Sequence, residues 1–67
     1  MEVNVQRLKE LRRQKVLSMR ELEEMSGVSY NTIWRIENGL TGAQPRTIRK
    51  IAKVLGVEPA ELTTEGE

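Results

Sequence analysis

Residues 18–39 read SMRELEEMSGVSYNTIWRIENG and decide the fold, because they contain two helix starts separated by a glycine turn. Ser18 and Glu21 fit the capping box S-x-x-E, in which the two side chains satisfy free backbone N–H groups at the start of a helix. Leu17 and Leu22 flank that cap at the spacing of a hydrophobic staple. A helix is therefore predicted to begin directly after Ser18.

The same device recurs eleven residues further along the chain. Ser29 is the second cap, and Val28 and Ile33 form the second staple. Gly27 lies between the two helical patterns, where a left-handed backbone conformation ends the first helix. Two helix starts this close together indicate a helix-turn-helix, and one use of that motif is to place its second helix in the DNA major groove.

Hydrophobic residues recur at helical spacing along the rest of the chain, and no segment alternates as a β-strand would. Asn4 and Pro45 suit the starts of two further helices. The expected helices cover residues 5–15, 19–26, 30–38, 45–55 and 59–62. Met25 is expected to point inward and Leu62 to close the core.

These elements predict an all-α fold of five helices in one compact domain over residues 1–67. We expect its core within residues 5–62. Residues 63–67 are expected to form a frayed acidic tail, because chain ends order poorly unless they are tied down.

The composition excludes several classes of function. The chain has no cysteine and no histidine, so it lacks thiolate metal ligands and the commonest general base. A helical domain of 67 residues rarely encloses a substrate cleft. We therefore expect no enzyme activity, no metal and no cofactor. No segment approaches the roughly 20 apolar residues of a membrane span, and the start lacks the apolar region of a signal peptide, which predicts a cytoplasmic protein that does not engage a membrane.

The net charge of +1 conceals an asymmetry. Residues 58–67 carry four glutamates and no basic residue, so the other 57 residues hold 11 basic and 10 − 4 = 6 acidic groups, a net charge of +5. A basic body suits contact with DNA phosphates. The alternative is that the lysines and arginines only solvate helix faces.

The second helix of the motif has two distinct sides when its residues are placed at about 100° per residue. The inward side, which is mostly apolar, carries Ser29, Ile33, Ile36, Glu37 and Leu40. The outward side carries Asn31, Trp34, Arg35 and Asn38, with Tyr30 and Thr32 on the flanks.

The outward side is rich in groups that read bases. Asparagine can pair in bidentate fashion with adenine, and arginine with guanine. Asn31 and Arg35 are four residues apart, so they could address neighbouring base pairs. Ser29 and Thr32 carry hydroxyls near the helix N-terminus, where a phosphate is favoured.

Simpler explanations exist for the same residues. Asn31, Arg35 and Asn38 could merely face water, as polar residues usually do. Trp34 weakens that alternative, because an exposed tryptophan usually has a partner. It could pack on Tyr30 or on the loop at Leu40, or it could lie along the DNA backbone or in a protein interface.

The segments LKELRRQKVLS, GVSYNTIWRIENG and IRKIAKVLGV resemble the Cro/repressor-type helix-turn-helix family, the xenobiotic-response-element-like transcriptional regulators. The resemblance covers about residues 5–62. It implies a compact five-helix domain in which the helix at 30–38 is the recognition helix. It also implies binding to operator DNA as a dimer and regulation of transcription, most often as a repressor.

The resemblance assigns roles to individual residues. The family's base-contacting positions fall on Tyr30, Asn31 and Arg35. Its phosphate-contacting positions fall on Met19, Ser29, Thr32 and Asn38, and Trp34 joins them if it lies along the DNA backbone. The family often pairs an arginine with the glutamate of E-N-G, which implies a partly buried ion pair between Arg12 and Glu37.

Two residues depart from the family pattern. Met19 stands where glutamine is common, so only its backbone N–H can serve a phosphate. Glu23 stands where the family prefers alanine at the close approach of the two helices, and we expect its carboxylate to lie in solvent.

Two functions remain in view. The first is a sequence-specific DNA-binding regulator that acts as a homodimer, with Leu40, Val54, Val57 or the last helix as dimer surface. The second is a protein-interaction module, such as the antitoxin of a toxin–antitoxin pair, for which the glutamates after Val57 would suit a basic protein partner.

Overall fold

The computed structural model describes residues 1–64, which form four α-helices and one turn of 3-10 helix. The elements are α1 (Val5–Gln14), α2 (Met19–Ser26), α3 (Tyr30–Glu37), α4 (Pro45–Leu55) and η1 (Pro59–Leu62). The all-helical prediction is confirmed, and each predicted boundary lies within one residue of the observed one. The count of five α-helices is wrong, because η1 has four residues between an extended Glu58 and an extended Thr63 and so forms only a 3-10 turn.

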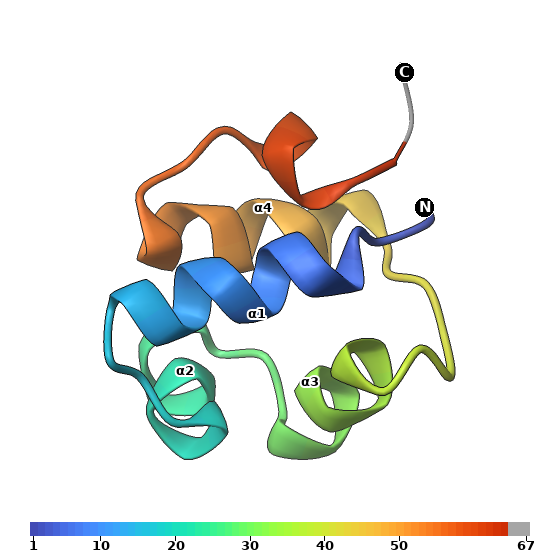
Figure 1. Ribbon diagram of the computed structural model, residues 1–67. Helices are drawn as coiled ribbons and strands as arrows, with labels where there is room; N and C mark the ends of the chain where they lie inside the picture. Colours follow the sequence, from blue (N-terminus) through green and yellow to red (C-terminus); the bar gives the residue numbers. More distant parts are fainter. Residues whose placement is uncertain (65–67) are drawn as a thin grey trace.

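Helices α2 and α3 lie together at the lower end of the view in Figure 1, opposite η1 and the N-terminus. Helix α2 packs against α3 and α4, α1 packs against α3, and η1 packs against both α1 and α4. The buried apolar core consists of Val3, Leu8, Leu11, Leu22, Val28, Ile33, Ile36, Ala43, Ile48, Ile51, Ala52, Leu55 and Leu62. Within residues 1–64, no helix has the length and apolar character needed to cross a membrane.

The predicted caps of the helix-turn-helix are present. The Glu21 backbone N–H donates to Ser18 Oγ at 3.1 Å, and the Ser18 N–H donates to Glu21 Oε1 at 3.0 Å, which completes the capping box. Gly27 ends α2 with a φ of 78°, a conformation that suits glycine because it has no Cβ. Two residues later, Ser29 Oγ accepts the Thr32 N–H at 3.2 Å and starts α3.

The capping box makes the stability of the fold depend on pH. Hydrogen bonds from the Ser18 backbone N–H, and then from its hydroxyl, lower the pKa of Glu21 below its ordinary value. Stability from a carboxylate of lowered pKa is fully present above the unfolded value, about 4.3, and is lost as the pH falls through the folded value. We expect the drop in melting temperature between neutral pH and about pH 3 to be smaller in Glu21→Gln than in the unaltered chain. Equal drops in circular-dichroism melts would show that the capping box does not couple folding to this proton.

Two predictions about side-chain direction are wrong. Met25 was expected to point inward, yet it is 60% exposed, because the contact side of the short α2 runs through Met19, Leu22, Glu23 and Ser26. Leu40 was placed on the core side of the second helix, yet it is 63% exposed. Helix α3 has already ended at Glu37, so helical spacing no longer describes position 40.

The expected fraying of the chain end is wrong for Thr63 and Thr64. Thr63 is buried and forms an antiparallel bridge with Val3, and the Thr64 N–H donates to the Glu2 carbonyl at 3.2 Å. The packed part of the chain therefore extends beyond both limits, 5 and 62, that helical periodicity indicated. The rest of the predicted tail, residues 65–67, lies outside the described residues.

Val16 has an unfavourable backbone conformation in the turn between α1 and α2. Its φ is 55°, in the left-handed region, and the residue is 85% exposed. A β-branched residue is an outlier there, because its Cβ crowds the backbone. Burial of the side chain does not compensate for that strain.

Replacing Val16 with glycine should therefore stabilise the fold by about 1 kcal/mol. Relief of left-handed strain, roughly 1–2 kcal/mol, exceeds the extra backbone entropy of glycine in the unfolded chain, roughly 0.5–1 kcal/mol. Chemical denaturation measures the gain. Val16→Ala keeps the Cβ and is the matched control, so a glycine variant no more stable than the alanine variant would contradict the strain argument.

Candidate nucleic-acid interface

Helix α3 presents a polar face on the side opposite its buried residues. Ile33 and Ile36 are fully buried. Asn31 and Arg35 are exposed and lie one turn apart along the helix, while Tyr30 at its start is half-buried. The three predicted base-contacting residues are thus brought together on one accessible stretch of α3.

The residues predicted to contact phosphates surround that stretch but already make internal hydrogen bonds. Ser29 Oγ donates to Thr32 Oγ1 at 2.8 Å, and the hydroxyl pair closes the first turn of α3. Asn38 Nδ2 donates to the Trp34 carbonyl at 2.7 Å at the other end of the helix. Met19 is half-buried against the core at the start of α2, so its side chain is directed away from a ligand.

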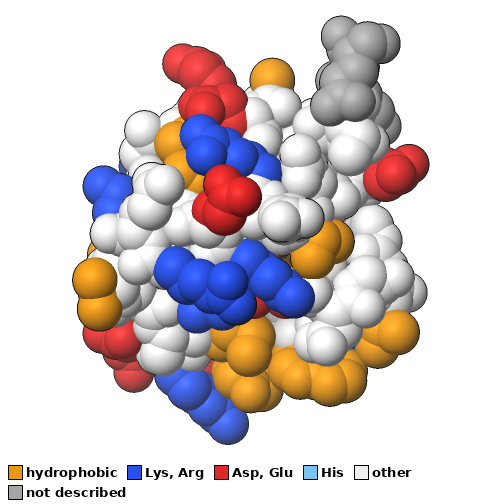
Figure 2. All heavy atoms as spheres, in the orientation of Figure 1, with side chains coloured by type: hydrophobic (Ala, Val, Ile, Leu, Met, Phe, Trp, Pro, Cys, Tyr) orange, Lys and Arg blue, Asp and Glu red, His pale blue; other side chains and the backbone are white. Residues whose placement is uncertain are grey.

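Trp34 is 40% exposed and is one of the large apolar residues at the surface of this region. Figure 2 shows hydrophobic side chains along the lower edge of the molecule, where Figure 1 places α2 and α3. The indole keeps accessible surface for a partner.

Arg12 and Glu37 form an ion pair that joins α1 to the end of α3. Arg12 Nε lies 2.7 Å from Glu37 Oε2, and Nη2 lies 2.9 Å from Oε1, a bidentate geometry. Arg12 Nη1 also donates to the Leu17 carbonyl at 2.8 Å. The two side chains are only 15% and 3% exposed, so the pair fixes the orientation of α3 and is not available to a ligand.

The expectation that the Glu23 carboxylate lies in solvent is wrong. Glu23 Oε2 accepts the backbone N–H of Tyr30 at 2.7 Å, and the side chain is 35% exposed. The first N–H groups of a helix have no partner within the helix, so the carboxylate of α2 satisfies the first donor of α3.

Sequence reasoning also missed a residue beside this contact. The guanidinium carbon of Arg20 lies 4.2 Å from the centre of the Tyr30 ring, and Arg20 Nη1 lies 3.7 Å from Glu23 Oε1. The i, i+3 spacing of Arg20 and Glu23 was visible in the sequence. The stacking on Tyr30 depends on the packing of α2 against α3 and was not.

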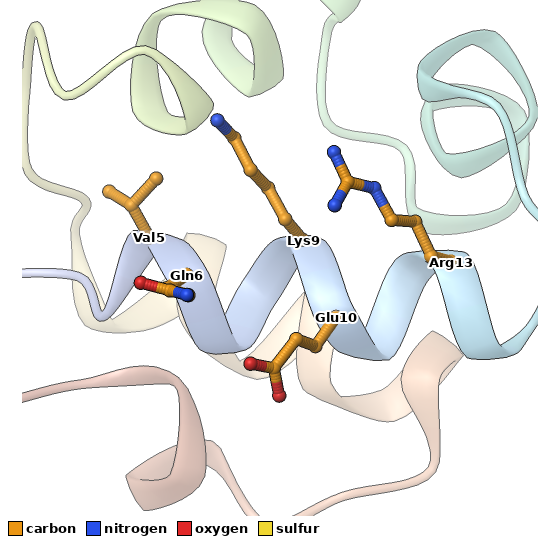
Figure 3. A pocket seen from close by; sticks show the side chains of 5 residues that line it. All are labelled: Val5, Gln6, Lys9, Glu10 and Arg13. Carbon is orange, nitrogen blue, oxygen red and sulfur yellow. The ribbon is translucent and has the colours of Figure 1, made fainter.

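A hollow on α1 is the other feature that a ligand could use. It is lined by Val5, Gln6, Lys9, Glu10 and Arg13, and Figure 3 shows Lys9 and Arg13 pointing to the side of α2 and α3 while Glu10 points the other way. Glu10 Oε2 lies 3.5 Å from Arg7 Nη1 in an exposed pair. These five residues offer no nucleophile beside a base, so the hollow supports no catalytic arrangement.

Lysine and arginine side chains are gathered across the front of the molecule, over α1, in Figure 2. The helix pair at the lower end carries little of this charge, since α2 and α3 contain only the basic residues Arg20 and Arg35. The positive charge of the predicted interface is therefore concentrated at two positions.

Two short helices joined by a glycine turn, the second with an exposed polar face, define a helix-turn-helix protein. The family model HTH_3, described as helix-turn-helix, matches residues 8–62. The chain belongs to this family, as the resemblance in its sequence indicated.

Curated relatives carry the names of transcriptional regulators. The chain is 49% identical over 53 residues to an uncharacterized HTH-type transcriptional regulator, RghRB of Bacillus subtilis (strain 168), a match that covers 78% of this chain and 38% of that protein. It is 36% identical over 61 residues to the HTH-type transcriptional regulator PuuR of Escherichia coli (strain K12), which covers 91% of this chain and 33% of that protein. The chain thus spans well under half of each of these relatives.

Two solved structures share the fold. The restriction-modification controller protein C.AhdI from Aeromonas hydrophila superposes with a TM-score of 0.80 at 37% identity, covering 85% of this chain and 86% of that one. An HTH_3 family transcriptional regulator from Vibrio cholerae superposes with a TM-score of 0.79 at 30% identity, covering 85% of this chain and 32% of that one.

Proposed function

We propose that this chain is a sequence-specific DNA-binding transcriptional regulator, and specifically a repressor that places α3 in the major groove of its operator. The observation that carries the proposal is the exposure of Asn31 and Arg35, one turn apart, on the side of α3 opposite its buried isoleucines. An amide and a guanidinium at this spacing suit an adenine and a guanine in neighbouring base pairs. The names of the relatives support a regulatory role.

The proposal gives each predicted residue a role. Tyr30, Asn31 and Arg35 contact bases. The phosphates are contacted by the Met19 backbone N–H and by Ser29, Thr32, Trp34 and Asn38. Phosphate contacts fix the position of the protein on the duplex, and base contacts supply the sequence preference. A cytoplasmic location follows from the proposal, since that is where such an operator would be met.

We further propose that the chain acts as a homodimer on a pseudo-palindromic site. Two recognition helices related by a two-fold axis would lie about 34 Å apart, one turn of DNA. Leu40 is well exposed and Val54 and Val57 are partly buried against the core, so each leaves some apolar surface for a second copy.

Selection of binding sites from random duplex DNA at near-physiological salt tests the proposal. We expect enrichment of a two-fold site whose half-site spacing matches one turn of DNA. No enrichment would contradict it and would favour the alternative, a protein-interaction module such as an antitoxin, for which exposed Glu58 and Glu61 suit a basic partner.

A further inference from the structure

Three residues form a bridge between α2 and α3 at the start of the recognition helix. Glu23 Oε2 accepts the Tyr30 backbone N–H at 2.7 Å. Its other oxygen, Oε1, lies 3.7 Å from Arg20 Nη1, and the Arg20 guanidinium carbon stands 4.2 Å from the centre of the Tyr30 ring. The bridge therefore holds a cation beside the first residue of α3.

The bridge changes what the start of α3 can offer a phosphate. A helix N-terminus attracts anions through its free N–H groups and its dipole. Here Glu23 occupies the Tyr30 N–H, and Ser29 Oγ occupies the Thr32 N–H. Two of these donors are used, and a carboxylate already stands at the site. Attraction for a phosphate must therefore come mainly from a charged side chain.

The charges of the helix pair leave few candidates for that side chain. Residues 19–37 carry four glutamates and only two basic residues, Arg20 and Arg35. The other residues proposed to contact phosphates are uncharged, and only lysine or arginine contacts release the counterions that make DNA binding depend on salt. Arg35 is assigned to a base, which leaves Arg20.

Arg20 is also prepared for this contact. Its side chain is 73% exposed, so most of its five N–H donors face solvent. Stacking on Tyr30 and the approach to Glu23 restrict its rotamers, which reduces the entropy lost when it binds. A stacked guanidinium keeps its edge free for a bidentate contact with phosphate oxygens.

We propose that Arg20 contacts a DNA phosphate at the junction of α2 and α3 and is held in place for that contact by Glu23 and Tyr30. This inference rests on the proposed function. It assigns the salt-dependent phosphate contact at this end of the interface to a residue outside the family-derived set.

The test is the salt dependence of binding by the full chain to a duplex with the selected site and to a scrambled duplex. Fluorescence anisotropy would give Kd between about 50 and 200 mM salt for the unaltered chain, Arg20→Ala, Arg20→Lys and Arg49→Ala. Arg49 is an exposed arginine on α4 and is the matched control. Melting curves would show that each variant is folded.

We expect Arg20→Ala to make the slope of log K against log salt shallower by about 0.9 and to weaken binding to both duplexes by the same factor. Arg20→Lys, which keeps the charge, should restore the slope, and Arg49→Ala should not change it. An unchanged slope in Arg20→Ala, while the unaltered chain binds its selected site, would overturn this inference and leave the proposed function standing. Failure of the unaltered chain to bind any duplex would overturn both.

Discussion

Glu37→Ala should lower the free energy of unfolding by about 3–5 kcal/mol, the usual cost of removing one member of a buried ion pair. Domains below 70–80 residues rarely gain more than about 3–5 kcal/mol from a single core. We therefore expect the variant to be close to unfolded at room temperature. Its melting temperature should fall by at least about 12 °C, given 4–8 °C per kcal/mol for a domain of this size.

The size of the effect follows from what the substitution leaves behind. Arg12 would keep one hydrogen bond, from Nη1 to the Leu17 carbonyl, and lose the two that join it to Glu37. Its guanidinium would remain a largely buried charge without a counter-ion. Glu37 is also the last residue of α3, where a negative charge meets the negative end of the helix dipole unless a cation offsets it.

A matched control separates burial from charge alone. Glu10 pairs with Arg7 at 3.5 Å, but both side chains are well exposed, at 50% and 38%. Glu10→Ala should change the stability by less than about 1 kcal/mol, as is usual for surface pairs. If the two alanine variants melted at the same temperature, Arg12 would have to reach water without Glu37, and the assignment of the pair to the core would fail.

The sequence predicted the helix-turn-helix well because its signals are local. The capping box of Ser18 and Glu21 and the turn at Gly27 depend on residues only a few positions apart. The buried isoleucines of α3 follow from helical spacing, which is why its inner and outer sides were assigned correctly for residues 31–37.

The errors arose where distant segments meet or where a helix had already ended. Thr63 is ordered by Val3, sixty residues away, and no local pattern indicates that pairing. Leu40 was assigned by helical spacing beyond the end of α3. Glu23 was expected in solvent because its partner is a backbone N–H of the next helix, and backbone donors carry no sequence signal. The same limit hid the stacking of Arg20 on Tyr30.

The combined variant Asn31→Ala/Arg35→Ala should abolish the preference for the selected DNA site. Each well-made bidentate pair discriminates against a wrong base by about 1–3 kcal/mol, so the two together should reduce the preference by roughly 30-fold to 10⁴-fold. Binding to a scrambled duplex should fall much less, because it depends on phosphate contacts that these two residues do not make in the proposed complex. Competition between labelled selected duplex and unlabelled scrambled duplex measures the ratio.

The fold should survive this variant, which distinguishes it from Glu37→Ala. Both side chains are exposed, and no hydrogen bond within residues 1–64 uses the side chain of Asn31 or Arg35, so their removal costs little packing. The matched control is Arg13→Ala/Gln14→Ala, which removes an arginine and an amide from exposed positions at the end of α1. If both double variants kept the full site preference, α3 would not be the reading element. If both lost it equally, the loss would reflect net charge or a general defect and not base recognition. Loss confined to the α3 variant, with an unchanged melting temperature, is the outcome that the geometry of this helix leads us to expect.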